Sequence, residues 1–104
     1  MSITFEIQAN SIEEFKALES EGAPYFNMSN SNAFVFQNNI LGIEADYCGT
    51  LDPVVILEKE EELRANARYQ DIISNGYSYW QDRVTNLIEV ARVARSLDKQ
   101  ISFC

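Results

Sequence analysis

Apolar and polar residues alternate near both ends of the chain. This period of two covers about residues 2–8 and returns in residues 100–104, where the apolar positions are Ile3, Phe5, Ile7, Ile101 and Phe103. Such alternation predicts strands with one buried face. Pairing the two strands as neighbours in one small sheet would bury both apolar faces under helices.

Apolar residues spaced three and four apart predict helices between these strands. The first helix follows Ser11-Ile-Glu-Glu14, which has the form of a capping box. We expect it to turn Ile12, Phe15 and Leu18 toward the core and to stop at Gly22.

The segment 29–42 admits two structures, and it follows a short strand expected at Tyr25–Met28. Ser29 or Ser31 can cap a helix that ends at Gly42. However, Phe-Val-Phe is β-prone and Asn-Ser-Asn suits a turn, so a hairpin competes with the helix. We favour the helix.

Two further helices have clear start signals. Asp52 can cap a third helix with Pro53 at its first position, and residues 65–74 would continue it as a second helical piece. A box at Ser78-Tyr-Trp-Gln81 opens the longest helix, which is expected to run to about Asp98. Its buried stripe would be Trp80, Val84, Leu87, Ile88, Ala91 and Ala94.

These elements predict one α+β domain over residues 1–104. Its small sheet would contain both terminal strands and would be packed by three or four helices. No linker or internal repeat divides the sequence, and 104 residues is the usual size of one domain.

Charge is divided unevenly along the chain. Residues 1–62 contain twelve Asp and Glu against two Lys, a formal charge of −10, whereas residues 63–104 carry +2. The net charge of −8 opposes direct binding to nucleic acid or to anionic lipid, since both are polyanions. A basic surface of another protein is the partner that this charge favours.

Location and cysteine chemistry follow from what the sequence contains. No apolar stretch is long enough to span a bilayer, and the first residues lack the pattern of a signal peptide, so we expect a cytoplasmic protein without membrane contact. Cys48 and Cys104 are then expected to be free thiols. Three neighbouring carboxylates oppose ionisation of Cys48, which we expect to be buried and unreactive.

Histidine is absent, and no phosphate loop, dinucleotide fingerprint or metal-binding spacing is present. We therefore predict that the protein is not an enzyme and uses no cofactor or metal. A small hydrolase that works through carboxylates is the remaining catalytic alternative.

The strongest local charge lies in Glu58-Lys-Glu-Glu-Glu62 on the third helix. Glu58, Glu61 and Glu62 stand at i, i+3 and i+4, so on one helix they would share a face that could bind a basic partner. A solvated helix face is the alternative, and the spacing of Glu60 and Glu61 to Arg64 would allow pairing that weakens the patch.

Two other groups are weaker candidates. Arg92, Arg95 and Lys99 could form an anion-binding stripe on the last helix, although cations near a helix C-terminus also stabilise its dipole. Aromatic residues cluster at the start of that helix, where Trp80 is expected in the core and Tyr79 is expected to be exposed and to contact a partner.

The segments Asn27-Met-Ser-Asn-Ser-Asn-Ala33, Leu41-Gly42 and Cys48-Gly-Thr-Leu-Asp52 share a pattern of helix caps and glycine stops. In this respect the chain resembles small uncharacterised proteins of bacteria and their phages. The resemblance implies an accessory protein of a bacterium or mobile element, and it carries no functional residue across.

Two functions are consistent with these observations. In the first, the acidic part docks on a basic protein surface, as an adaptor or as an inhibitor that presents carboxylates where phosphates would lie. In the alternative, the domain self-associates through an apolar face as a homodimer. The first complex should weaken with ionic strength, whereas the second should not.

Overall fold

The computed structural model describes residues 1–104 and shows an α+β fold. Four antiparallel strands form one sheet in the order β2-β1-β4-β3. The elements in chain order are β1 (Ser2–Ile7), α1 (Ile12–Ser20), β2 (Tyr25–Ser29), α2 (Asn30–Val35), the π-helix η1 (Phe36–Leu41), β3 (Gly49–Leu51), α3 (Pro53–Glu58), α4 (Glu60–Ser74), α5 (Tyr79–Ser96) and β4 (Ile101–Phe103).

The two terminal strands pair as the sequence predicted. Phe5 lies opposite Phe103 and Ile7 opposite Ile101, so the apolar faces of β1 and β4 coincide. Beyond β4, Cys104 exchanges two backbone hydrogen bonds with Thr4. The two terminal strands β1 and β4 therefore form the centre of the open sheet, and β2 and β3 are its edge strands.

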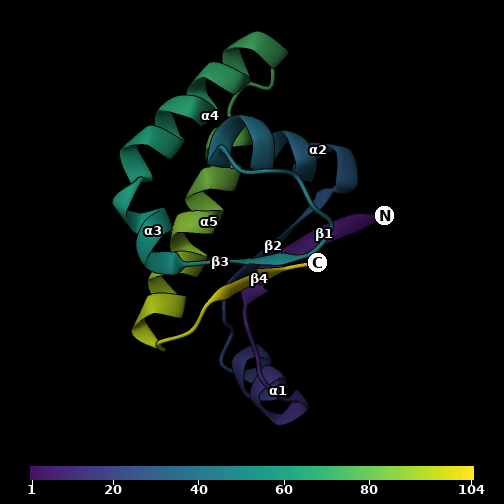
Figure 1. Cartoon of the computed structure of the whole chain (residues 1–104), viewed down its shortest axis with the longest axis vertical. Helices are drawn as coiled ribbons and strands as arrows, with labels where there is room; N and C mark the ends of the chain where they lie inside the picture. Colours follow the sequence, from purple (N-terminus) through teal and green to yellow (C-terminus); the bar gives the residue numbers. More distant parts are fainter.

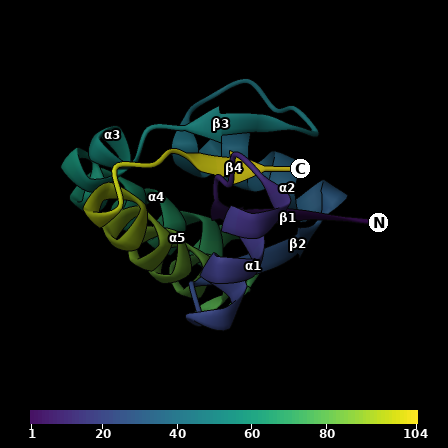
Figure 2. The ribbon, with the colours of Figure 1, turned by 90° about the horizontal axis from the view of Figure 1, so that it is seen from below.

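Helices α2 and α5 pack on the apolar face of this sheet, and α3 and α4 contact α5 from outside (Figure 1). The ring of Phe5 stacks between those of Phe26 and Phe103, and its edge meets Phe36. Figure 1 shows α1 apart from the other helices, and in Figure 2 it overlaps β1 and β2. The core thus lies between the sheet and α5.

The segment 29–42 is helical, which confirms the preferred alternative. The Ser29 side chain accepts a hydrogen bond from the Asn32 amide at 3.3 Å, and the helix ends at Gly42 in a left-handed conformation (φ 68°). The last six residues widen into the π-helix η1, a form that sequence periodicity does not signal.

Helix α1 packs less closely on the core than its pattern of apolar residues predicted. Ser11 caps it as expected, accepting the Glu14 amide at 3.1 Å. Leu18 is buried, but Ile12 is 74% exposed and Phe15 43%, so the expectation that both face the core was wrong. An ion pair between Glu14 and Lys99 also fastens this helix to the body.

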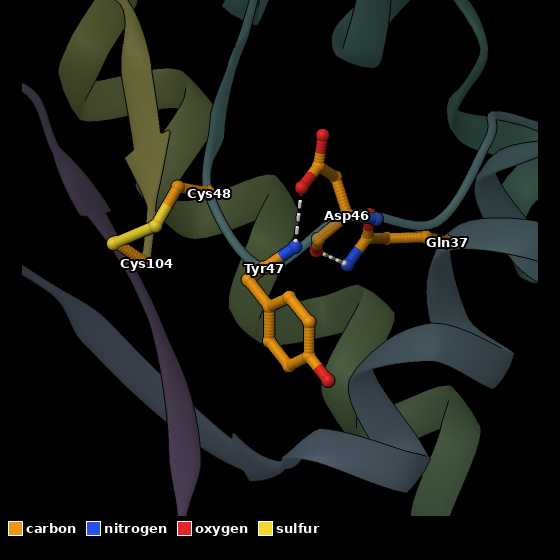
Figure 3. Close-up of a disulfide and its surroundings, with 5 residues drawn as sticks. All are labelled: Gln37, Asp46, Tyr47, Cys48 and Cys104. Carbon is orange, nitrogen blue, oxygen red and sulfur yellow. Dashed lines mark hydrogen bonds between the residues drawn. A yellow bond between two sulfur atoms is a disulfide. The ribbon is translucent and has the colours of Figure 1, made fainter.

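A disulfide joins Cys48 to Cys104, and the expectation of free thiols was wrong (Figure 3). Cys48 precedes β3 and Cys104 follows β4, so the bond closes the end of this strand pair, where Gly49 lies opposite Phe103. Both cysteines are exposed, which also corrects the expected burial of Cys48. Pairing depends on the fold, which brings together residues 56 apart in sequence.

A buried side chain fixes the loop before Cys48 through hydrogen bonds. Gln37, which is fully buried, exchanges two hydrogen bonds with the backbone of Asp46, at 2.9 and 3.0 Å (Figure 3). The Asp46 carboxylate in turn accepts the Tyr47 amide at 2.7 Å. These bonds fix the approach of Cys48 to the sheet.

The N-terminus of α5 is capped by a residue from another helix. Ser78 was the expected cap, but its side chain accepts no capping bond. Instead the Asp71 carboxylate, from α4, accepts the amides of Trp80 and Gln81 at 2.8 and 3.0 Å and the Gln81 side chain at 3.1 Å. Asp71 is 3% exposed, so it joins two helices at a dry site.

Candidate functional site

The acidic residues Glu58, Glu61 and Glu62 are all exposed, but they do not lie on one helix. The chain is interrupted at Lys59 (φ −98°, ψ 12°), so Glu58 ends α3 while Glu61 and Glu62 lie in the first turn of α4. None of the three takes part in an ion pair. The junction therefore presents three free carboxylates from two helices.

Glu60, between them, is fully engaged. Its carboxylate accepts Arg64 at 3.0 Å and Arg92, from α5, at 3.5 Å. The predicted pairing of Glu60 with Arg64 is thus confirmed, and Arg64 bonds Thr85 rather than Glu61. The pairing leaves the charge of the neighbouring carboxylates uncompensated.

The three cations proposed as an anion-binding stripe do not form one. Helix α5 ends at Ser96, so Lys99 lies outside it and pairs with Glu14. Arg92 pairs with Glu60, and Arg95 remains as the member without an ion pair. Two of the three cations are therefore already paired with carboxylates of this chain.

Exposed apolar residues gather at the C-terminal end of α4. The sequence indicated an aromatic cluster here, to which Tyr69 and Tyr77 belong, but it did not single out Ile72 and Ile73. Tyr69 is 65% exposed, Ile72 69% and Ile73 56%. Tyr77, in the following turn, is 93% exposed and has a left-handed backbone (φ 55°), an uncommon conformation for an aromatic residue. Their spacing of three and four was detectable, but it equally suits a buried stripe.

The same outward face of α4 carries both kinds of residue. At 100° per residue, Glu61, Glu62, Tyr69, Ile72 and Ile73 fall within one arc of the helix, opposite the buried Leu63 and Ala67. Contiguous apolar surface of this kind marks interaction sites more often than chance exposure does. The arc is the first candidate surface of the protein.

Tyr79 does not belong to this surface. It is half-buried, not exposed as expected, and its hydroxyl accepts the Asn32 side chain at 3.0 Å. The ring meets Trp80 edge-on, and the Arg83 guanidinium lies 4.5 Å from its centroid. Tyr79 thus ties α5 to α2, although its proposed contact with a partner stays a prediction.

The second candidate surface is a cavity of about 490 Å³ between α1 and the face of the sheet that the other helices leave open. Thr4 and Glu6 of β1 and Tyr25 of β2 form its floor. The wall is largely apolar and consists of Ile7, at the end of β1, together with residues of α1 and the following turn: Phe15, Leu18, Glu19, Gly22, Ala23 and Pro24. Sequence reasoning did not locate this cavity.

Glu6 is the titratable group that this cavity perturbs. Burial raises the pKa of its carboxyl above the usual value, because the charged form loses water. Glu19 and Tyr25 are the other titratable groups that line the cavity, and no cation lines it. Glu6 also takes part in none of the ion pairs.

Replacing Glu6 by Gln is therefore expected to raise the free energy of unfolding at pH 7 by up to about 0.5 kcal/mol, a small value because water still reaches the group. A raised pKa means that the folded protein holds this proton more tightly than the unfolded chain does. The stability from this group is present below the unfolded pKa and is lost as the pH rises through the folded pKa. Urea denaturation from pH 3.5 to 7 should thus show that the free energies of unfolding of the parent and of Glu6→Gln become equal at the acid end of this range.

Glu13 of α1, which is exposed and does not line the cavity, is a matched control. Glu13→Gln should not stabilise the protein at pH 7, because a carboxylate in the first turn favours the helix dipole. A gain from Glu6→Gln that is constant across this pH range would contradict the assigned cause.

No three His, Cys, Asp or Glu side chains gather in a way that could hold a metal ion, and no helix combines the length and hydrophobicity of a membrane crossing. Comparisons with protein-family models, with curated proteins and with solved structures return no match. No residue's role can therefore be carried over from a relative.

Proposed function

We propose that this protein docks on a basic, partly apolar surface of another protein. The contact uses the outward face of α4 together with Glu58, and the protein acts as an adaptor or as an inhibitor that presents carboxylates where phosphates would lie. That the protein is not an enzyme stays a prediction.

The observation that carries this proposal is the combination of groups on one helix face. Tyr69, Ile72 and Ile73 supply apolar and aromatic area, the usual source of binding energy at interfaces. Glu61 and Glu62, about two to three turns away and free of ion pairs, supply the charge that speeds association and selects a basic partner. A helix face that is merely exposed to solvent would need only the carboxylates and not the exposed apolar residues.

The test begins with isolation of the partner from the native host, followed by binding kinetics of the purified pair. Changing Glu58, Glu61 and Glu62 together to Gln should lower the association rate by about tenfold at low salt and flatten its salt dependence. Tyr69→Ala should instead raise the dissociation rate by about tenfold.

A triple change of Glu13, Glu21 and Glu44 to Gln removes the same charge from exposed positions elsewhere and serves as the control. If the two triple variants bind alike, or if the association rate is indifferent to several-fold higher salt, the acidic face of α4 is not the docking surface.

Self-association is the second candidate, and the same exposed side chains favour it. Tyr69, Ile72, Ile73 and Tyr77 could pack against their equivalents in a two-fold dimer. Such a dimer would persist in high salt and dissociate on Ile72→Asp, which sedimentation would detect. The basic-partner complex would show the opposite salt response.

We also propose a cytoplasmic location. In that compartment the two cysteines would not stay joined as a disulfide. A reducing compartment keeps thiols free, so the cytoplasmic protein would carry Cys48 and Cys104 as two exposed thiols. Alkylation and mass spectrometry of the protein isolated from its host distinguish this form from the bonded one.

A further inference from the structure

The cavity beneath α1 has the features of a binding site and is separate from the docking face on α4. Helix α1, which supplies part of the cavity's lining, lies at the opposite end of the molecule from the C-terminal end of α4 (Figure 1). The cavity volume of about 490 Å³ falls in the range of ligand-binding clefts. Phe15, at 43% exposure, and Tyr25, at 66%, are the two aromatic residues that line it.

The polar groups of the cavity have one sign of charge. Glu6 and Glu19 line it, and no lysine or arginine does. The cation that reaches α1, Lys99, is already held by Glu14. The Glu6 carboxylate is partly buried and forms no ion pair with another residue of the chain. A cation bound in the cavity would therefore compensate its negative charge.

We propose that this cavity binds an arginine side chain of an extended segment of a partner protein. The methylene stem contacts Leu18 and Pro24, while the guanidinium lies against the rings of Phe15 and Tyr25 and pairs with Glu6 and Glu19. Arginine fits better than lysine, because a planar guanidinium both stacks on aromatic rings and bonds two carboxylates. The site is separate from the surface on α4 and does not depend on it.

The experiment uses the whole protein and a defined probe, the peptide acetyl-Gly-Arg-Gly-amide, followed by amide and side-chain NMR shifts. The same peptide with citrulline in place of arginine keeps the size, the planar shape and part of the set of N–H donors but lacks the charge. The arginine peptide is expected to shift resonances of β1, β2 and α1 around the cavity, and the citrulline peptide to leave them in place.

Glu6→Gln should weaken binding of the arginine peptide by about fivefold to tenfold, the loss expected for one charge-assisted pair. This variant is expected to be at least as stable as the parent, so the loss would not reflect unfolding. Glu13→Gln, on α1 but outside the cavity, should change binding less than twofold.

Equal binding of the two peptides, shifts confined to α3 and α4, or unchanged affinity in Glu6→Gln would each overturn the proposal. These outcomes leave the docking surface on α4 untouched, because that surface is tested by salt response and by Glu58, Glu61 and Glu62.

Discussion

Removal of the Cys48–Cys104 disulfide is expected to lower the free energy of unfolding by about 4 kcal/mol. The bond spans 56 residues, and a cross-link over a loop of that length strongly restricts the unfolded chain. It also secures β3, an edge strand of three residues that pairs with β4 alone. Chemical denaturation of the oxidised protein, compared with the double variant Cys48→Ser and Cys104→Ser, measures the effect.

Each single substitution should cost about as much as the double one, because either breaks the same bond. With a reducing agent present, the parent and all three variants should unfold at nearly the same denaturant concentration, since both cysteines are exposed and serine fits there. Equal stability of the oxidised and reduced parent, within about 1 kcal/mol, would contradict the stabilising role.

Replacement of Asp71 by Ala is expected to cost about 3 kcal/mol. The change removes three hydrogen bonds to a buried carboxylate and leaves the amides of Trp80 and Gln81 without an acceptor at the start of α5. It also removes a negative charge that stabilises the helix N-terminus. Urea unfolding monitored by the fluorescence of Trp80, which packs beside this site, provides the measurement.

Ser78→Ala is the matched control, because Ser78 is the cap that the sequence suggests and the structure does not use. We expect a loss below about 0.5 kcal/mol, because Ser78 is exposed and its side chain bonds the exposed Asp82 rather than a backbone amide of α5. A larger loss at Ser78 than at Asp71 would show that the helix is capped locally.

The predictable part of the fold is the part set by neighbouring residues. Alternation at β1 and β4 predicted two strands and their pairing, and the caps Ser11, Ser29 and Asp52 predicted three helix starts. Gly42 marked a helix end for the same local reason. In each case a few adjacent side chains determine the backbone.

The features that were missed depend on residues that meet only in the folded chain. Asp71 caps a helix that begins eight residues later, and Cys48 finds Cys104 through the sheet. The cavity around Glu6 forms where α1 crosses strands whose outward residues look merely solvated in sequence. The exposed isoleucines at the end of α4 were missed because periodicity shows an apolar stripe but not whether another element covers it.

The pairing of β1 with β4 has a consequence for the order in which the fold assembles. Helices α4 and α5 are consecutive and are joined by Asp71 across nine and ten residues, so this hairpin closes a short loop and can form early. The centre of the sheet instead joins Phe5 to Phe103 and requires closure of nearly the whole chain. Folding should therefore start at the helical hairpin and be limited by the arrival of β1 beside β4, which makes it slower than the folding of a helical bundle of the same size.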